Sequence, residues 1–120
     1  MAQSTFTSVE HLPAAVVVHV LPDSLGKAEV DGVCAGVDQA RETAPQLPFV
    51  IDMANVGHIG SLAIGVLVGL NKEFVNRGQR LIFAGLQSHL YGAIKVTHLH
   101  KVLEIVSDVP AALRSAEGKD

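Results

Sequence analysis

The sequence predicts an α/β fold in which a small mixed β-sheet of four to five strands carries its helices mainly on one face. Three observations lead to this expectation. Short apolar runs rich in β-branched residues alternate with longer stretches of helical periodicity. Proline, glycine, asparagine and serine punctuate the boundaries between them. At the centre of the chain a strand, a helix and a strand follow one another, which requires a right-handed crossover between parallel neighbours.

Length and composition bound the architecture. With 120 residues, 48% hydrophobic and 18% charged, we expect one globular domain over residues 1–120, with a core at about 6–116 and a frayed tail at 117–120. The net charge of −3 and the lack of a basic cluster argue against a nucleic-acid partner. The single Cys34 excludes an internal disulfide and is typical of a reducing compartment. With no signal peptide and no apolar stretch near the roughly 20 residues of a membrane span, we expect a cytoplasmic protein.

The N-terminal half begins with a weakly signalled edge strand at residues 6–10 and a clearer strand at 14–21. His19 interrupts the second strand, and we expect it to be a hydrogen-bonded histidine on a strand face, since no partner has metal-ligand spacing with it. Asp23 or Ser24 can cap the next helix, which runs to about residue 43. Its glycines weaken it by about 1 kcal/mol each relative to alanine, so tertiary packing must hold it.

The C-terminal half alternates in the same way. Gly78 is placed to end the central helix in a left-handed conformation, and residues 80–85 form the next buried strand. A short helix follows at 87–95, with Ser88 as its candidate cap, and a last strand at 102–106. Asp108 caps the final helix, which has Pro110 in its first turn.

The central segment carries the most information. Its strand, residues 49–53, is apolar except for Asp52, and a loop with turn-forming glycines leads to Ser61, which we interpret as a helix N-cap. The predicted core face of that helix consists of Leu62, Ala63, Val66, Leu67, Leu70 and Phe74. Ile64, Val68 and Val75 form a second apolar stripe, and Ser61 and Lys72 lie along its edge. This stripe is either a docking surface beside a modifiable serine, or a side covered by another helix or a subunit, with Ser61 an ordinary cap.

We find no catalytic constellation, and we expect no enzyme activity, cofactor or metal. The glycine loop at residues 57–60 lacks the lysine and spacing of a phosphate-binding loop. His98 and His100 would not share one side of a helix, which argues against metal ligation by a helical segment there. Asp52 ends a strand, where sites of α/β proteins gather, but a carboxylate there can equally accept hydrogen bonds from loop amides.

The central segment resembles a known family. The run from Asp52 to Gly65 is similar to the signature of STAS domains, which occur in anti-sigma factor antagonists and sulfate transporters, and Asp52, Val56, Ile59, Ser61 and Gly65 match it without a gap. Residues 96–105 resemble the family's second block, Leu-Thr-Gly-Leu-Asp-x-Leu-Phe-x-Ile. The resemblance covers about residues 6–116 and implies a STAS-like fold.

The resemblance implies a regulatory protein-protein switch in signal transduction and transcription. In STAS antagonists, a serine kinase that is also an anti-sigma factor phosphorylates the serine that corresponds to Ser61, and the unmodified domain binds that kinase. Ser61 is therefore the candidate phosphorylation site. The expected partner-binding residues are Asp52, His58, Ile59, Gly60, Ser61, Ile64, Val68 and Lys72.

The chain also departs from the family pattern at important positions. Gly60 replaces the acid that precedes the serine, and His98 and His100 replace the glycine and aspartate of the second block. These departures favour two alternatives: a subunit of an ABC lipid-transport ATPase, or a member of a stress-signalling scaffold, with Ser61 only a helix N-cap. The sequence leaves open whether the chain forms a homodimer.

Overall fold

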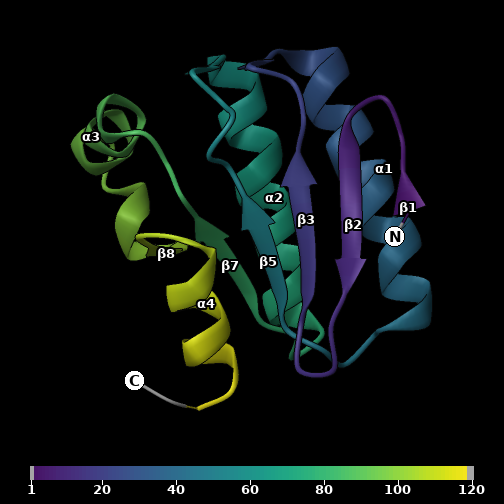
Figure 1. Ribbon diagram of the computed structural model, residues 1–120. Helices are drawn as coiled ribbons and strands as arrows, with labels where there is room; N and C mark the ends of the chain where they lie inside the picture. The colour runs from purple at the N-terminus through teal and green to yellow at the C-terminus, as the bar shows by residue number, and fades with distance from the viewer. Residues whose placement is uncertain (1, 119–120) are drawn as a thin grey trace.

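The computed structural model describes the backbone of residues 2–118 and the side chains of residues 4–118. A six-stranded sheet forms its centre, with the strands in the order β1-β2-β3-β5-β7-β8 (Figure 1). The edge strand β1 (Ala2–Gln3) has two residues and was not expected, whereas the other five strands confirm the predicted mixed sheet.

The strands lie within or close to their predicted segments. They are β2 (Thr7–His11), β3 (Val16–Val20), β5 (Phe49–Asp52), β7 (Leu81–Ala84) and β8 (Glu104–Val106). The β2 strand is antiparallel to β3, and β3, β5, β7 and β8 run parallel to one another. The predicted parallel crossover between β5 and β7 is confirmed. The carboxyl ends of β3, β5 and β7 consequently meet at one end of the sheet.

The helices are unequally divided between the two faces of the sheet. They are α1 (Lys27–Thr43), α2 (Ser61–Asn76), α3 (Ser88–Val96) and α4 (Val109–Ala116), with a 3-10 turn η1 (Leu99–Lys101) after α3. Helices α1 and α2 cover one face, and α4 crosses part of the other (Figure 1). The prediction that helices pack mainly on one face is confirmed. None of the helices in residues 2–118 is long and apolar enough to cross a membrane.

Alternating residues of the buried strands supply two separate cores. In β3, Val16, Val18 and Val20 face α1 and α2, whereas Val17 faces the side on which α4 lies. The larger core includes the edge-to-face pair of Phe49 and Phe74, whose ring centroids are 5.4 Å apart. Because both faces of the central strands are largely covered, these strands are apolar over most of their length, as is typical of parallel sheets, and His19 of β3 and Asp52 of β5 are exceptions.

Helix α1 begins later than predicted. Its N-cap is Gly26, because Ser24 and Leu25 form a short strand, β4 (Ser24–Leu25), in place of the expected first turn. The Glu29 carboxylate, in the first turn of the helix, accepts a hydrogen bond from the Gly26 N–H at 2.9 Å and so stabilises the start of the helix. The expectation that Asp23 or Ser24 caps this helix was wrong.

The glycines of α1 have a packing role. A Cβ atom on Gly32 would lie 2.2 Å from the Phe6 ring, and one on Gly36 would lie 2.7 Å from Thr7 Oγ1. No real side chain tolerates such distances, so the segment that enters β2 can approach α1 this closely only over glycine. This contact is the tertiary packing that the glycine-rich helix requires.

The remaining helix ends mostly follow the sequence signals. Gly78, with φ of 67°, ends α2 in the left-handed conformation, as predicted. The Asp108 carboxylate accepts a hydrogen bond from the Ala111 N–H at 2.8 Å and caps α4, as predicted. The N-cap of α3 is Gln87, so the expectation for Ser88 was off by one residue.

Candidate functional site

The loop that leads into α2 is fixed by a structure that the sequence did not predict. Strand β4 pairs in parallel with β6 (His58–Ile59), so the entrance to α1 and the entrance to α2 are tied together. The Asp23 carbonyl accepts hydrogen bonds from the N–H groups of Gly57 and His58, at 2.7 and 3.2 Å. The Leu25 carbonyl accepts one from Gly60 at 2.9 Å. These bonds hold the first turn of α2 in place on the larger core.

Ser61 is the first residue of α2, and Gly60 is its N-cap. Gly60 has extended φ and ψ of −70° and 157°, and its carbonyl accepts the first helical bond from the Ile64 N–H at 3.1 Å. The interpretation of Ser61 as the N-cap was therefore off by one position, because Gly60 takes over the bond to Leu25 and the turn into the helix. The Ser61 side chain is exposed to solvent.

The core face of α2 is confirmed in part. Ala63, Leu67, Leu70 and Phe74 are buried, but Leu62 is 71% exposed. Each residue turns about 100° around the axis, and Leu62 falls on the side where Gly69 is exposed. Leu62 was wrongly predicted to lie in the core because nearly every position in the first turns of this helix is apolar. The apolar pattern therefore does not show which side of the helix is exposed.

The second apolar stripe is divided in the structure. Ile64 and Val68 are half-buried, and Val68 packs against the larger core. Val75 is 66% exposed, and Lys72 is exposed as well. Solvent therefore meets an outer face of α2 that consists of Ser61, Leu62, Gly65, Gly69, Lys72, Glu73, Val75 and Asn76. Ile64 and Val68 border this outer face and contribute only partly to it.

Two other predicted partner-binding residues lie next to the start of the outer face. His58 is exposed, whereas Ile59 is half-buried against the larger core. On the far side of the loop, the Nε2–H of His89 donates to the Gly57 carbonyl at 2.7 Å. His89 belongs to α3, and nothing in the sequence pattern singled it out as a support of this loop.

Asp52 lies away from the outer face. It follows Val50 by two residues, so its side chain lies on the sheet face of α4, opposite to α2. One carboxylate oxygen accepts from the Ala54 N–H at 3.0 Å, and the other lies 2.7 Å from Nδ1 of His19. The loop-amide role considered for Asp52 is confirmed, and its predicted part in partner binding stays a prediction, with its side chain on the sheet face opposite to α2. His19 is hydrogen-bonded on a strand face, as predicted.

The second sequence block forms the turn between α3 and β8. His98 adopts the left-handed conformation, with φ of 62°, which favours glycine, and glycine is the residue in the family pattern at this position. The rings of His98 and His100 lie 6.2 Å apart between centroids. Within residues 4–118, no three histidine, cysteine, aspartate or glutamate side chains gather as a metal site would require.

Cys34 has the character expected of a packed side chain. It lies half-buried on α1 against the larger core. Burial raises the pKa of its thiol to about 11, with further contributions from Asp38, Asp31 and Glu73. The thiolate needed for nucleophilic or redox chemistry is therefore scarce near neutral pH.

Comparison with known proteins identifies the fold. The STAS domain family pattern matches residues 8–112. A putative anti-sigma factor antagonist from Thermotoga maritima superposes with a TM-score of 0.79, at 14% identity over 92% of this chain and 94% of that chain. A STAS domain protein from Planctomyces limnophilus, described as an anti-sigma-factor antagonist, superposes with a TM-score of 0.77, at 22% identity over 95% and 99%.

A third solved structure agrees with these two. The anti-sigma factor antagonist SpoIIAA in its unphosphorylated form has a TM-score of 0.70 to this chain, at 16% identity over 93% of this chain and 98% of that chain. Identities this low show a shared fold alone, whereas the family pattern spans most of the sequence. The chain belongs to the STAS domain family.

Proposed function

We propose that this chain is a non-catalytic regulatory module that binds a serine kinase acting as an anti-sigma factor through the outer face of α2. The observation that carries the proposal is the 71% exposure of Leu62 directly beside Ser61, on a helix start that the β4–β6 pair holds in place. The descriptions of the similar structures as anti-sigma factor antagonists support the same class of function.

The outer face has the composition of a surface that a partner covers. Leu62 and Val75 expose large apolar side chains, and between them Gly65 and Gly69 have no atom within 4 Å of a would-be Cβ. A partner helix or loop could approach the α2 backbone closely over the two glycines and bury both apolar side chains. Lys72 adds a positive charge to the same face, and Glu73 adds a negative one.

Ser61 is well placed for a phosphorylation that spares the fold. The first turn of α2 contains no acidic residue, and the first N–H groups of any helix lack partners within that helix. A phosphate on Ser61 would therefore meet the positive end of the helix dipole. To a partner that covers Leu62, the added charge of about −2 would be costly to desolvate. Modification should release the partner without unfolding the domain.

The alternative is a constitutive subunit of an ABC lipid-transport ATPase or of a stress-signalling scaffold, in which Ser61 is only the first residue of a helix. Gly60, in place of the family's acid, favours this alternative because it removes a charge next to the serine. In such a complex the outer face would still be the contact surface, but its affinity would not depend on the modification of Ser61.

One experiment separates the two candidates. The protein is purified from its native host with its bound partner, the partner is identified by mass spectrometry, and its affinity for wild type, Ser61→Ala and Ser61→Asp is measured by calorimetry. For the switch, we expect a kinase or anti-sigma factor, with Ser61→Asp weakening binding at least about tenfold, or about 1.4 kcal/mol. Ser61→Ala should bind like wild type, and thermal unfolding of both variants should stay close to that of wild type.

Leu62→Glu provides the matched variant for the contact itself. It should weaken binding in both candidate complexes because Leu62 is exposed, whereas Val68→Glu would also disturb the core that Val68 contacts. Equal affinity of Ser61→Asp and wild type, together with loss of binding in Leu62→Glu, would contradict the switch and support the constitutive subunit. Unchanged binding of Leu62→Glu would contradict the proposed surface altogether.

A further inference from the structure

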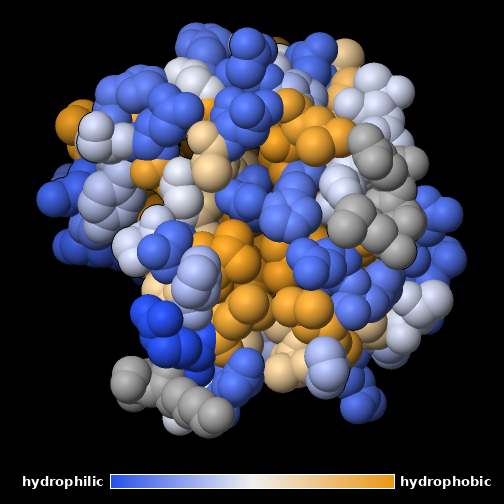
Figure 2. Space-filling view, in the orientation of Figure 1, coloured by the Kyte–Doolittle hydropathy of each residue, from blue (hydrophilic) through white to orange (hydrophobic). Residues whose placement is uncertain are grey.

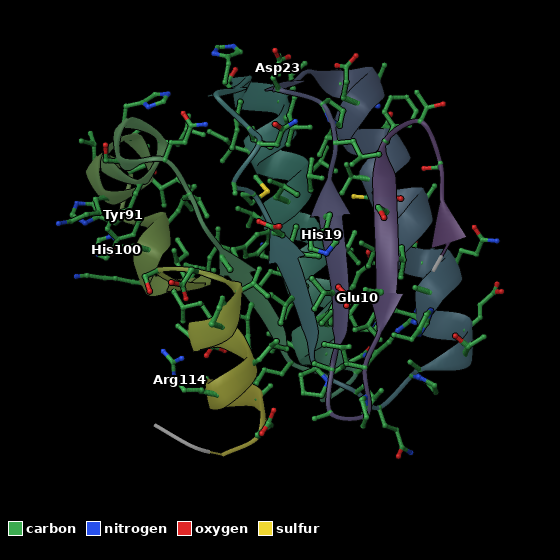
Figure 3. The ribbon with its side chains drawn as sticks, in the orientation of Figure 1. Glu10, His19, Asp23, Tyr91, His100 and Arg114 are labelled. Carbon is green, nitrogen blue, oxygen red and sulfur yellow. The ribbon has the colours of Figure 1, made fainter. Side chains whose placement is uncertain are left out.

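A cluster of three titratable side chains crosses the sheet face opposite to α2. Glu10 of β2, His19 of β3 and Asp52 of β5 lie on adjacent strands, with His19 between the two carboxylates. The Nδ1 atom of His19 is 2.7 Å from Asp52, and its Nε2 atom is 3.3 Å from Glu10. Figure 3 shows the side chains of His19 and Glu10 together on this face of the strands.

This part of the sheet face is open to protons. Helix α4 packs against β5, β7 and β8, so β2 and the end of β3 have no helix above them (Figure 1). The side chains of His19, Glu10 and Asp52 are 33%, 42% and 20% exposed. Figure 2 shows hydrophilic residues among apolar surface in the area where Figure 3 labels His19 and Glu10. The cluster is thus accessible to water, yet partly desolvated.

The geometry favours a protonated ring. Both ring nitrogens face a carboxylate, and only the imidazolium form can donate from both of them at once. Partial burial lowers the pKa of His19, but the hydrogen bonds and charges of Asp52 and Glu10 raise it by more, so the net shift is upward from 6.5. Within residues 4–118, Asp52 and Glu10 are the charged groups that act on this ring.

The same cluster touches the loop that leads into α2. Asp52 holds His19 with one oxygen and the Ala54 N–H with the other. The next residue, Asn55, donates through its side-chain amide to the Leu21 carbonyl, just beyond the end of β3. From the other side, Gln87 Nε2 donates to the Ala54 carbonyl at 3.3 Å. The first residues of the loop are therefore held by the ends of β3 and β5.

We propose that Glu10, His19 and Asp52 form a proton-sensitive link that ties the protonation of His19 to the position of the loop running from Ala54 to Ser61. When the ring loses its proton, Nδ1–H can stay with Asp52, and Nε2 then presents a lone pair to the Glu10 carboxylate. Two carboxylates then surround a neutral ring. Asp52 then no longer faces a cation, and the hydrogen bond that it accepts from the Ala54 N–H changes as a result.

The link acts as a positioning device for the start of the outer face. It deepens the proposed function, because the loop ends at Ser61, but it can be tested without any partner. A failed test would leave the docking of a partner on α2 standing, and a failed docking experiment would leave the link standing. The direction is set by linkage: protonated His19 stabilises the folded state fully below about pH 6.5, and this contribution is lost as the pH rises through its raised pKa.

The test is an NMR titration of the full chain between about pH 5 and 9, the range in which histidines titrate. We expect the His19 ring to titrate with a midpoint above 6.5, and the amide signals of Ala54 and of the residues up to Ser61 to follow the same midpoint. His19→Gln should abolish this shared transition. Glu10→Gln, which keeps the size of the side chain, should move the His19 midpoint downward and the amide midpoint with it.

His11→Gln is the matched control, because it removes an exposed histidine from the end of the same strand as Glu10. It should leave the amide transition unchanged. Amides at 54–61 that ignore the pH while the His19 ring titrates would overturn the proposal, as would a His19 midpoint at or below 6.5. If His19→Gln does not fold, the joint shift of ring and amides in Glu10→Gln decides the question.

Discussion

Helices α1 and α2 lie on the same face of the sheet, and each has a pair of glycines one turn apart. In α1, Gly32 and Gly36 lie under Phe6 and Thr7, at distances that leave no room for a Cβ atom. In α2, a Cβ atom added to Gly65 or Gly69 would have no atom of another element within 4 Å. The two pairs have the same spacing, and their surroundings are opposite.

The difference separates a structural use of glycine from a surface that stays open. The α1 pair admits the segment around β2 to the larger core, and this contact compensates for the low helix propensity of glycine. The α2 pair weakens its helix to a similar degree, and no contact within the described chain compensates for it. A contact with a partner on the outer face of α2 is the simplest use of these glycines, in line with the proposed docking.

Alanine at Gly32 should have the largest effect on stability. The new Cβ atom would lie 2.2 Å from the Phe6 ring, so the ring must move out of its place. Overpacking typically costs about 1–3 kcal/mol, and the better helix propensity of alanine returns about 1 kcal/mol. We expect the free energy of unfolding, measured by urea denaturation, to fall by up to about 2 kcal/mol.

A double-mutant cycle identifies the cause of that loss. In a Phe6→Ala background the clash is removed, and Gly32→Ala should then be neutral or stabilising. If the loss persists without the Phe6 ring, the close packing of α1 against this segment is not the reason for the glycine. The structural role given to the glycines of α1, on which the comparison with α2 depends, would then be wrong.

The same substitution in α2 should act in the opposite direction. Gly69→Ala adds a Cβ atom that points into open space, so the gain in helix propensity is not offset. We expect the free energy of unfolding to rise by about 0.5–1 kcal/mol. A loss of stability in urea denaturation would mean that something covers Gly69 in solution, and would contradict an open outer face.

The sequence predicted the fold because its main elements have local signals. The runs at β3, β5 and β7 are apolar and β-branched, and Gly78 and Asp108 mark helix ends with the residues that their conformations require. Strands β4 and β6 carry no such signal, since a two-residue strand has no period and its partner is more than 30 residues away. This pair also shifted the N-cap of α1 to Gly26.

The site was predicted less completely than the fold. The helical pattern placed the N-cap of α2 one residue too late, at Ser61, and it could not show that the side chain of Asp52 lies on the sheet face opposite to α2. The contact between His19 and Asp52 depends on the register of two parallel strands, which their sequences do not encode locally. Leu62 was misplaced because the sequence of a helix that is apolar on most sides does not show which side faces the core.

Leu62 therefore provides the last prediction, with the smallest effect on stability. Because its side chain is 71% exposed, Leu62→Gln should change the free energy of unfolding by no more than about 0.5 kcal/mol at low protein concentration. A loss of several times that size would mean that Leu62 is buried in solution. Repeating the urea denaturation over a range of protein concentrations then shows whether a second copy of the chain covers Leu62. A second copy on the outer face would make the stability of the wild type rise with protein concentration, and Leu62→Gln would remove that dependence. If the stability of neither protein depends on its concentration, the outer face is free for a different partner.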